Sequence, residues 1–306
     1  MLRWWAMIRF DDFDAWGEAI SSASLRLACD AVETRAWTLG TVDLGGVVLQ
    51  IGWEGGGTLC YGANTHPGTI LFVPLTHAAE HIANGERLDD DSLLAIPSGA
   101  DFRIAVRKRA HAWCSIALPD DAAAMLRPTP ASARIACGPG LVPRVRRLAT
   151  EIAAALLDRS GGSAAHLTAG RTLAEAAMAC LPAQQAPPVP IGRPRFDRGE
   201  IVRRAMAAID GQAMLPTAAD LARDVGVTSR TLLRTFQETF GVPPRQYLIL
   251  RELHAVRRSL QTAAGADANV ADVLARHGVW DFGRFAARYR RHFGELPSVT
   301  LSRVRG

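Results

Sequence analysis

Apolar and polar residues alternate along most of the first 120 residues. The alternation is clearest over residues 37–55, where Gly45-Gly46 separates two runs. Four shorter apolar runs follow between turn-forming residues: TILFVPL, SLLAIP, DFRIAVRK and AWCSIALP. Many short strands at close spacing are typical of a β-sandwich or β-barrel. The pattern therefore predicts a β-rich region over residues 1–120.

Two local patterns refine this region. The spacing of apolar residues over Phe13–Leu25 predicts a short helix that covers one end of the sandwich or barrel. Residues 82–102 are the best candidate for a β-hairpin, with Asn84-Gly85 at its tip. Asparagine and glycine tolerate the positive φ angles that a tight hairpin turn requires, which is why we place the tip there.

The period changes to that of helices after residue 140. Apolar residues recur every three or four positions over Gly140–Leu157 and again over Thr168–Leu181. We expect the two helices to pair as a helical hairpin, joined by the sequence SGGS. Their alanine-rich faces suit close packing, which leaves two interpretations open: a dimer interface, or packing within the domain.

A proline-rich segment follows the helices. The stretch LPAQQAPPVPIGRPR, residues 181–195, contains five prolines and no apolar period, which indicates a semi-extended linker. The expected organisation is then a domain over 1–183, β-rich over 1–120 and helical over 140–181. A linker over 184–195 and a second domain over 196–306 complete the chain.

One pattern is written twice in the second domain. The copies are AADLARDVGVTSRTLLRTFQETFGVPP from Ala218 and VADVLARHGVWDFGRFAARYRRHFGELP from Val270, which carries one extra residue after its first glycine. Each copy predicts a helix, a glycine turn and a second helix. A helix over Asp197–Ile209 precedes the copies, and a long helix over Pro244–Leu260 joins them. Such a tandem unit is typical of two helix-turn-helix modules and therefore indicates DNA binding.

The charge of the chain is concentrated in the same region. The 306 residues have a formal net charge of +5. Residues 195–306 contain 18 arginines and 11 acidic residues, which gives +7, and residues 1–194 contain 17 basic and 19 acidic residues, which gives −2. The basic excess thus coincides with the repeat, as binding to a polyanion requires.

The second helix of the first copy has one apolar face and one polar face. Leu232 and Phe236 are four residues apart and should face the core. The residues of the opposite face are Arg230, Thr231 and Arg234. Arginine can bind guanine O6 and N7 with two hydrogen bonds, and threonine can contact the thymine methyl group. We therefore expect this face to contact base edges.

The second copy is less suited to hydrogen-bonded readout. Phe285 and Tyr289 are its expected buried pair. The outward residues are then Phe282, Arg284, Ala287 and Arg288. The arginines that suit phosphate contacts are Arg245, Arg290 and Arg291.

Together these residues resemble the AraC/XylS family of bacterial transcription regulators. The resemblance covers about Phe196 to Leu301 and is most specific in GVWDFGRFAARYRRHFGELP. It implies two helix-turn-helix units on a rigid joining helix, which enter successive major grooves on one face of the operator. It also implies base-reading positions for Arg230, Thr231 and Arg234 and for Gly283, Arg284 and Ala287. The full expected set is Thr228, Ser229, Arg230, Thr231, Arg234, Arg245, Phe282, Gly283, Arg284, Ala287, Arg288 and Arg291.

Three residues depart from the family pattern in the second unit. Val279 stands where the family usually has phenylalanine, Gly283 replaces a small polar residue, and Ala287 replaces a polar or basic one. We therefore expect a division of labour, in which the first unit reads the sequence and the second mainly holds the DNA backbone.

The first domain resembles the N-terminal domains of regulators similar to the ethanolamine-operon regulator, over FDDFDAW, GGVVLQ, FVPL and NGERLDDDSLLAIPSGADF. The two resemblances imply an α+β chain: a cupin-like β-barrel or sandwich with a helical hairpin, then an all-α tandem helix-turn-helix domain. They also imply a cytoplasmic, effector-responsive activator. Its implied partners are operator DNA, RNA polymerase, a small-molecule effector and a second copy of the chain.

Some cupins are metalloenzymes, so the histidines need a separate test. The candidate metal ligands are His66, His77, His81 and His111. The enzymes use two histidines one residue apart in a strand, and this chain has no such pair. We therefore expect no metal, no cofactor and no catalytic residue. Aromatic residues that either line a pocket or fill the core are Trp37, Trp53, Phe72, Phe102 and Trp113.

The remaining features are compatible with this assignment. The cysteines are Cys29, Cys60, Cys114, Cys137 and Cys180, which are scattered and form no CxxC motif, so we expect reduced thiols that fill the core. No apolar run reaches 18 residues, so we expect no transmembrane helix, and the start of the chain does not resemble a secretory signal.

Two alternative functions stay open: a cupin-type metalloenzyme domain fused to a DNA-binding domain, and a regulator that binds a protein partner and no effector.

Overall fold

A computed structural model describes residues 7–119, 133–156, 164–181, 197–212, 214–263 and 269–303. The chain divides into two compact units, residues 1–189 and 190–306. The linker expected over 184–195 lies outside the described residues.

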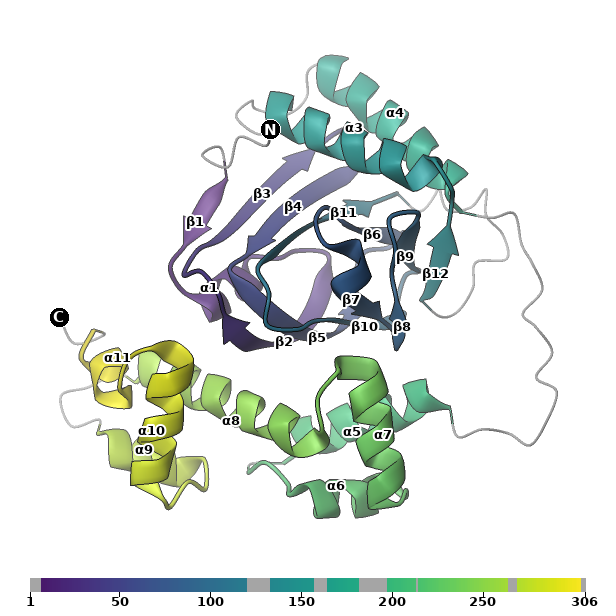
Figure 1. Cartoon of the computed structure of the whole chain (residues 1–306). Helices are drawn as coiled ribbons and strands as arrows, with labels where there is room; N and C mark the ends of the chain where they lie inside the picture. Colours follow the sequence, from purple (N-terminus) through teal and green to yellow (C-terminus); the bar gives the residue numbers. More distant parts are fainter. Residues whose placement is uncertain are drawn as a thin grey trace. The chain divides into compact units, whose positions relative to one another are not determined.

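The first unit is built on two antiparallel sheets (Figure 1). In spatial order, the seven-stranded sheet contains β1 (Ile8–Phe10), β3 (Trp37–Asp43), β4 (Val48–Glu54), β11 (His111–Ala117), β6 (Ile70–Pro74), β9 (Ser92–Ile96) and β12 (Arg134–Cys137). The five-stranded sheet contains β2 (Ala23–Val32), β5 (Gly56–Asn64), β10 (Asp101–Val106), β7 (His81–Ala83) and β8 (Glu86–Arg87). Among the described residues the two sheets do not close into a barrel, so the architecture is an open sandwich and the expected cupin-like barrel is not confirmed.

Alternation along the strands sends neighbouring side chains into different cores. In β11, Trp113 and Ala117 belong to the core between the two sheets. Cys114 and Ile116 belong to a second core on the other face of the seven-stranded sheet. Successive side chains of a strand point to opposite faces, so a strand that is covered on both sides needs apolar residues at nearly every position.

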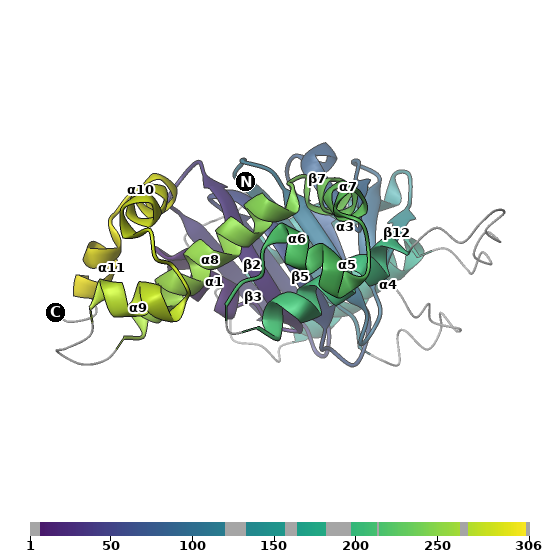
Figure 2. The same cartoon turned by 90° about the horizontal axis from the view of Figure 1, so that it is seen from below.

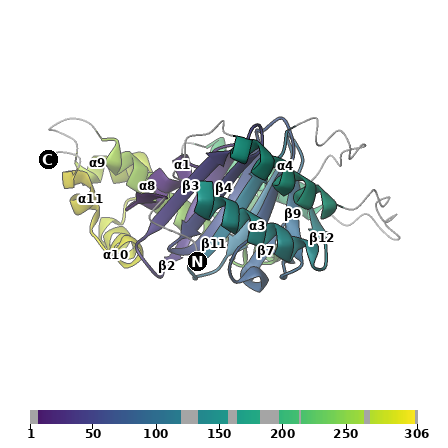
Figure 3. The same ribbon diagram turned by 90° about the horizontal axis from the view of Figure 1, so that it is seen from above.

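Two helices cover that other face. They are α3 (Leu141–Leu156) and α4 (Ala164–Ala179), and Figures 1 and 3 show them lying together across the strands. Val145 and Ala149 of α3 pack in one cluster with Leu49 and Leu71 of the sheet. The expected helical hairpin therefore packs within the domain along its apolar face, and the dimer interface stays a hypothesis.

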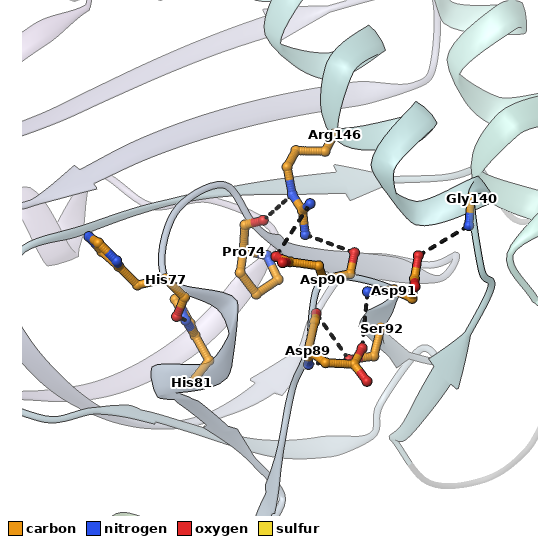
Figure 4. A network of polar contacts seen from close by, with 9 residues as sticks. All are labelled: Pro74, His77, His81, Asp89, Asp90, Asp91, Ser92, Gly140 and Arg146. Carbon is orange, nitrogen blue, oxygen red and sulfur yellow. Dashed lines mark hydrogen bonds and ion pairs between the residues drawn. The ribbon is translucent and has the colours of Figure 1, made fainter.

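Polar contacts hold the start of α3 to the end of β6 and to the loop that precedes β9. The Arg146 guanidinium donates from Nε to the Pro74 carbonyl oxygen (2.8 Å) and from Nη2 to that of Asp90 (3.2 Å). The backbone N–H of Gly140, just before the helix, donates to the Asp91 carboxylate (3.1 Å). Figure 4 shows these groups converging between the helix and the loop that precedes β9.

Two local expectations for this unit need correction. The helix expected over Phe13–Leu25 is shorter: α1 covers Phe13–Glu18, and Ala23 already begins β2. Ser22 has a φ of 69°, a conformation that interrupts a right-handed helix. The expected hairpin is correct only for β7 and β8, where Asn84 and Gly85 have φ angles of 52° and 91°. Its continuation, β9, lies in the other sheet.

The second unit contains the repeated helices. Their bounds are α5 (Arg198–Asp210), α6 (Ala218–Val225), α7 (Ser229–Phe240), α8 (Pro244–Gln261), α9 (Val270–Arg276), α10 (Phe282–Phe293) and α11 (Pro297–Arg303). Side chains of Thr217, Thr228, Asn269 and Asp281 cap the helices that follow them. Figure 2 shows α8 as a long helix, with α6 and α7 near one end and α9 and α10 near the other. Both helix-turn-helix units are confirmed as helical units.

Candidate DNA-binding interface and effector cavity

The first helix-turn-helix unit packs against the joining helix, α8, through buried aromatic side chains. Gly226 between α6 and α7 has a φ of 77°, which favours glycine, and the Thr228 hydroxyl accepts from the Thr231 backbone N–H at 3.1 Å. Phe236 of α7 is fully buried, and its ring lies edge-on to that of Tyr247 in α8 at 5.5 Å. This packing leaves the opposite face of α7 exposed.

That exposed face carries two of the expected base-reading arginines. Arg230 is exposed and forms no ion pair within the described part of the chain. The Arg234 side chain is 70% exposed, with its Nε 3.9 Å from Glu238 Oε1. Glu238 Oε2 is itself 3.0 Å from the Arg198 guanidinium, so the carboxylate is shared. Both arginines are therefore available to a ligand, and Arg230 has fewer local contacts.

Thr231 is less available than the sequence suggests. It is half-buried, and its hydroxyl oxygen lies 2.9 Å from that of Thr228, the capping residue. Both Thr228 and Ser229 are exposed at the start of α7. Thr231 thus belongs to the cap of the helix, whatever further contact it makes.

The second unit has the same framework. The Asp281 carboxylate accepts from the Arg284 backbone N–H at 3.1 Å and caps α10. Phe285 and Tyr289 are fully buried, as expected, and the Tyr289 hydroxyl lies 2.8 Å from the Thr300 hydroxyl of α11. The C-terminal helix therefore helps to hold α10 in place.

The outward residues of α10 differ in character from those of α7. Phe282, Gly283, Arg284 and Ala287 are all exposed. Arg288 is only half-buried against α8, with its Nη2 3.9 Å from Glu252 Oε2. The expected phosphate contacts Arg245, Arg290 and Arg291 are exposed, and none forms an ion pair with another described residue.

Trp280 is a surface feature that the sequence analysis did not single out. It lies in the turn before α10 and is 75% exposed. Its position is that of the extra residue in the second copy. The sequence feature that could have identified it is a large aromatic residue at the position of the insertion.

The first unit contains a cavity between its two sheets that is partly open to solvent. It has about 640 Å³ of empty volume, including space that is open to solvent. Its walls are largely apolar, from residues such as Trp16, Leu27, Ile70 and Ile104, and the expected pocket residues Phe72, Phe102 and Trp113 also line it. Trp37 belongs to the surrounding core, and neither it nor Trp53 is among the lining residues.

A buried polar cluster lies at this cavity. The Glu54 carboxylate accepts from the Trp113 indole N–H at 2.6 Å and from the Thr58 hydroxyl. His111 Nε2 is 3.5 Å from Glu54 Oε1. Gly52 makes room for the indole, because a Cβ there would lie 2.6 Å from Trp113 ring atoms. The strands β4, β5 and β11 together place these groups.

The pKa values of two neighbouring imidazoles, His111 and His81, are shifted in opposite directions. Burial lowers the pKa of His111, but the Glu54 carboxylate and hydrogen bonds to the backbone of Arg109 and Gly56 together outweigh it, so the pKa lies above the usual histidine value. Burial and the adjacent His111 lower the pKa of His81 to about 3. The rings pack edge-on at 5.0 Å, and His81 Nε2 has no hydrogen-bond partner among the described residues. His81 is therefore neutral near pH 7.

Of the four candidate metal ligands, His66, His81 and His111 each have a contact through a ring nitrogen. His66 Nδ1 accepts from the Gly68 backbone N–H at 3.1 Å, and the His77 carbonyl oxygen lies 3.1 Å from His81 Nδ1. Within the described ranges, no three His, Cys, Asp or Glu residues are grouped to hold a metal ion.

All five cysteines are free thiols, and only Cys137 is exposed. Burial raises the pKa of the Cys180 thiol to about 11 and that of Cys114 to about 12. No helix in the described part of the chain is both long and apolar enough to span a membrane.

Part of the second unit matches a known protein family. A family model described as a helix-turn-helix domain matches residues 221–303. The "Probable thc operon regulatory protein" of Rhodococcus erythropolis is 36% identical over 105 residues, which is 34% of this chain and 32% of that protein. The chain therefore spans about a third of the length of that relative.

Two further relatives are matched over most of their own length. The "XylDLEGF operon transcriptional activator 2" of Pseudomonas putida is 33% identical over 111 residues, which is 36% of this chain and 68% of that protein. A solved structure of a "probable AraC family transcriptional regulator" from Rhodopseudomonas palustris is 31% identical, covers 35% of this chain and 98% of its own, and has a TM-score of 0.32. With its paired helix-turn-helix units and a relative that is 33% identical over two thirds of its own length, the chain belongs to the AraC/XylS family of transcription regulators.

Proposed function

We propose that this regulator places α7 and α10 in successive major grooves of one operator. The observation that carries the proposal is the exposed arginine face of α7, on a helix that is locked to α8 through Phe236 and Tyr247. A rigid joining helix suits two units that must keep the spacing of one helical turn of DNA. Arg230 and Arg234 are assigned to base edges, and Arg245, Arg290 and Arg291 to phosphates.

Several finer assignments rest on analogy. The Pseudomonas putida relatives are named transcriptional activators, so we infer activation and contact with RNA polymerase for this chain as well. Homodimer formation through the first unit is part of the same proposal. These relatives are named as regulators, so we assign no catalytic role to either unit.

The DNA proposal is tested by measuring the salt dependence of binding. An operator is first selected from a random-sequence DNA pool, and its affinity is compared with that of a scrambled duplex by fluorescence anisotropy. We expect specific binding whose affinity falls steeply with salt, by about 0.9 logarithmic units in Kd per tenfold salt for each phosphate contact. Equal affinity for the operator and the scrambled duplex would contradict sequence-specific recognition.

We also propose that the sandwich cavity binds the effector. Its apolar walls suit a small apolar body, and the Glu54 cluster offers carboxylate oxygens as acceptors. None of the described lining residues is a lysine or arginine, and His111 already faces Glu54. A second buried carboxylate would lack a counter-ion, so the ligand should carry a hydrogen-bond donor and no negative charge.

A series of ligands with one body and three head groups tests this assignment. The probes are 2-phenylethanol, 2-phenylethylamine and phenylacetate, added to the full chain in a thermal unfolding assay. A donor-bearing probe at ten times its Kd should raise the midpoint by about 3–6 °C, and phenylacetate should not.

Variants of β2 locate the binding site. Ala23→Phe narrows the cavity and should abolish the shift, whereas Ser24→Phe, at an exposed neighbouring position, should leave it. Equal stabilisation by phenylacetate would refute the charge argument. No stabilisation by any member, in a wider ligand set as well, would favour a regulator that binds a protein partner instead.

A further inference from the structure

The two helix-turn-helix units present different chemistry at matching positions. Counted from the capping residues Thr228 and Asp281, the first unit has Ser229 and Arg230 where the second has Phe282 and Gly283. Six residues after the cap, the arginine of the first unit is absent from the second. Arg234 of α7 corresponds to Ala287 of α10. Groups that form hydrogen bonds in the first unit are thus replaced by apolar groups in the second.

These apolar groups are accessible. Phe282 is 40% exposed and Trp280, just before the cap, is 75% exposed. Ala287 is exposed one turn further along α10. At Gly283 a Cβ would have no neighbour within 4 Å among the described residues, so the space beside this backbone position is open. Single exposed apolar residues are common, but two large aromatic side chains at the start of one recognition helix form a local surface.

The charges around this surface select its partner. Arg284 is exposed two residues after Phe282, and Arg290 and Arg291 are exposed further along α10. Asp281, which caps the helix, lies 3.2 Å from the Arg284 guanidinium. An apolar surface within a group of arginines fits a polyanion that also displays apolar groups. In duplex DNA, the thymine C5-methyl group is such a group on a major-groove base edge.

We propose that the second unit recognises thymine methyl groups. Phe282 contacts the methyl groups, Ala287 allows close approach of the helix to the groove, and Trp280 extends the apolar contact at the turn. This assignment rests on the proposed DNA-binding function and revises the expectation that the second unit mainly holds the backbone. Both units then read sequence, the first through hydrogen bonds and the second through apolar contacts.

The proposal is tested by removing methyl groups from the operator and leaving its hydrogen-bonding pattern intact. In a selected operator, footprinting of wild type against Arg284→Ala identifies the half-site that α10 occupies. Each thymine there is replaced by deoxyuridine, which lacks only the C5-methyl group. Wild type should bind about fourfold more weakly for each contacted methyl group, the effect of losing one buried methyl or methylene.

Protein variants then show whether the loss runs through these side chains. Phe282→Ala should bind the thymine and deoxyuridine operators equally, and Trp280→Ala should reduce the difference. Leu233→Ala is the matched control, because Leu233 is 39% exposed on the other recognition helix. It should keep the full sensitivity to methyl removal. Circular dichroism checks that all variants keep the helical content of wild type.

The outcomes separate this inference from the function on which it rests. If wild type prefers the operator to scrambled DNA but no deoxyuridine substitution in the second half-site changes its affinity, methyl recognition is wrong and DNA recognition stands. Methyl sensitivity that Phe282→Ala retains in full would also overturn the assignment. If wild type does not prefer the operator at all, the proposed function itself fails.

Discussion

Replacing Arg230 with alanine should weaken specific operator binding by about 1–3 kcal/mol, or about 5- to 150-fold in Kd. Its guanidinium is exposed on α7 and forms no ion pair with another described residue, so its hydrogen bonds are available to guanine. The loss should be confined to the selected operator and largely absent on scrambled DNA. Fluorescence anisotropy with both duplexes measures the difference.

Arg234→Ala should also weaken specific operator binding, but by less. Arg234 lies 3.9 Å from Glu238 and must leave that carboxylate to bind a base. Arg203→Ala is the matched control. Arg203 is an exposed arginine on α5, bound to Glu200 at 2.7 Å, and its removal should change operator preference little. If both α7 variants bind the operator as tightly as wild type, the reading face is assigned wrongly.

Glu295→Ala should destabilise the second unit by about 3–5 kcal/mol. Glu295 Oε1 accepts from Arg257 at 3.2 Å and from the Thr300 hydroxyl at 2.8 Å, and its Oε2 lies 2.6 Å from Arg303. The Arg257 side chain is only 10% exposed, and its guanidinium stacks 4.5 Å from the centre of the Phe293 ring. The variant removes the Glu295 carboxylate from beside this buried guanidinium, and urea unfolding followed by circular dichroism measures the loss of stability.

An exposed carboxylate provides the comparison. Glu200→Ala removes a group that pairs with Arg203 and Arg204 on the surface of α5, where water screens such pairs, and should unfold at nearly the wild-type urea concentration. Equal unfolding midpoints for Glu295→Ala and wild type would show that this buried network does not support α8, α10 and α11.

In the second unit, the helix ends and the buried faces were predictable from residues close together in the sequence. Each helix begins near the expected residue, because Thr228 and Asp281 cap their helices through their own side chains. Glycines with φ near 70° end α6, α7 and α10. The buried faces follow from periodicity alone, so the exposure of Arg230 and Arg234 was predictable as well.

The first unit shows where such reasoning ends. Many strands were predictable from alternation, but β2 was assigned in part to a helix, and β1, β5 and β12 were missed, since no local pattern identifies their partner strands. The helical hairpin was expected, but its packing on the seven-stranded sheet was one of two open interpretations. Which sheet a strand joins depends on residues far away in the chain, as the separation of β8 from β9 shows.

By itself, the sequence determined the tandem helix-turn-helix units, their caps and the exposed arginine face, because each depends on residues within a few turns of one another. Only the tertiary structure decided which polar side chains gain a local partner, such as Arg288 beside Glu252. It also decided the cavity, where β4, β5 and β11 bring Glu54, Thr58 and His111 together. Strand pairing over such separations depends on the packing of the whole domain, which no local pattern contains.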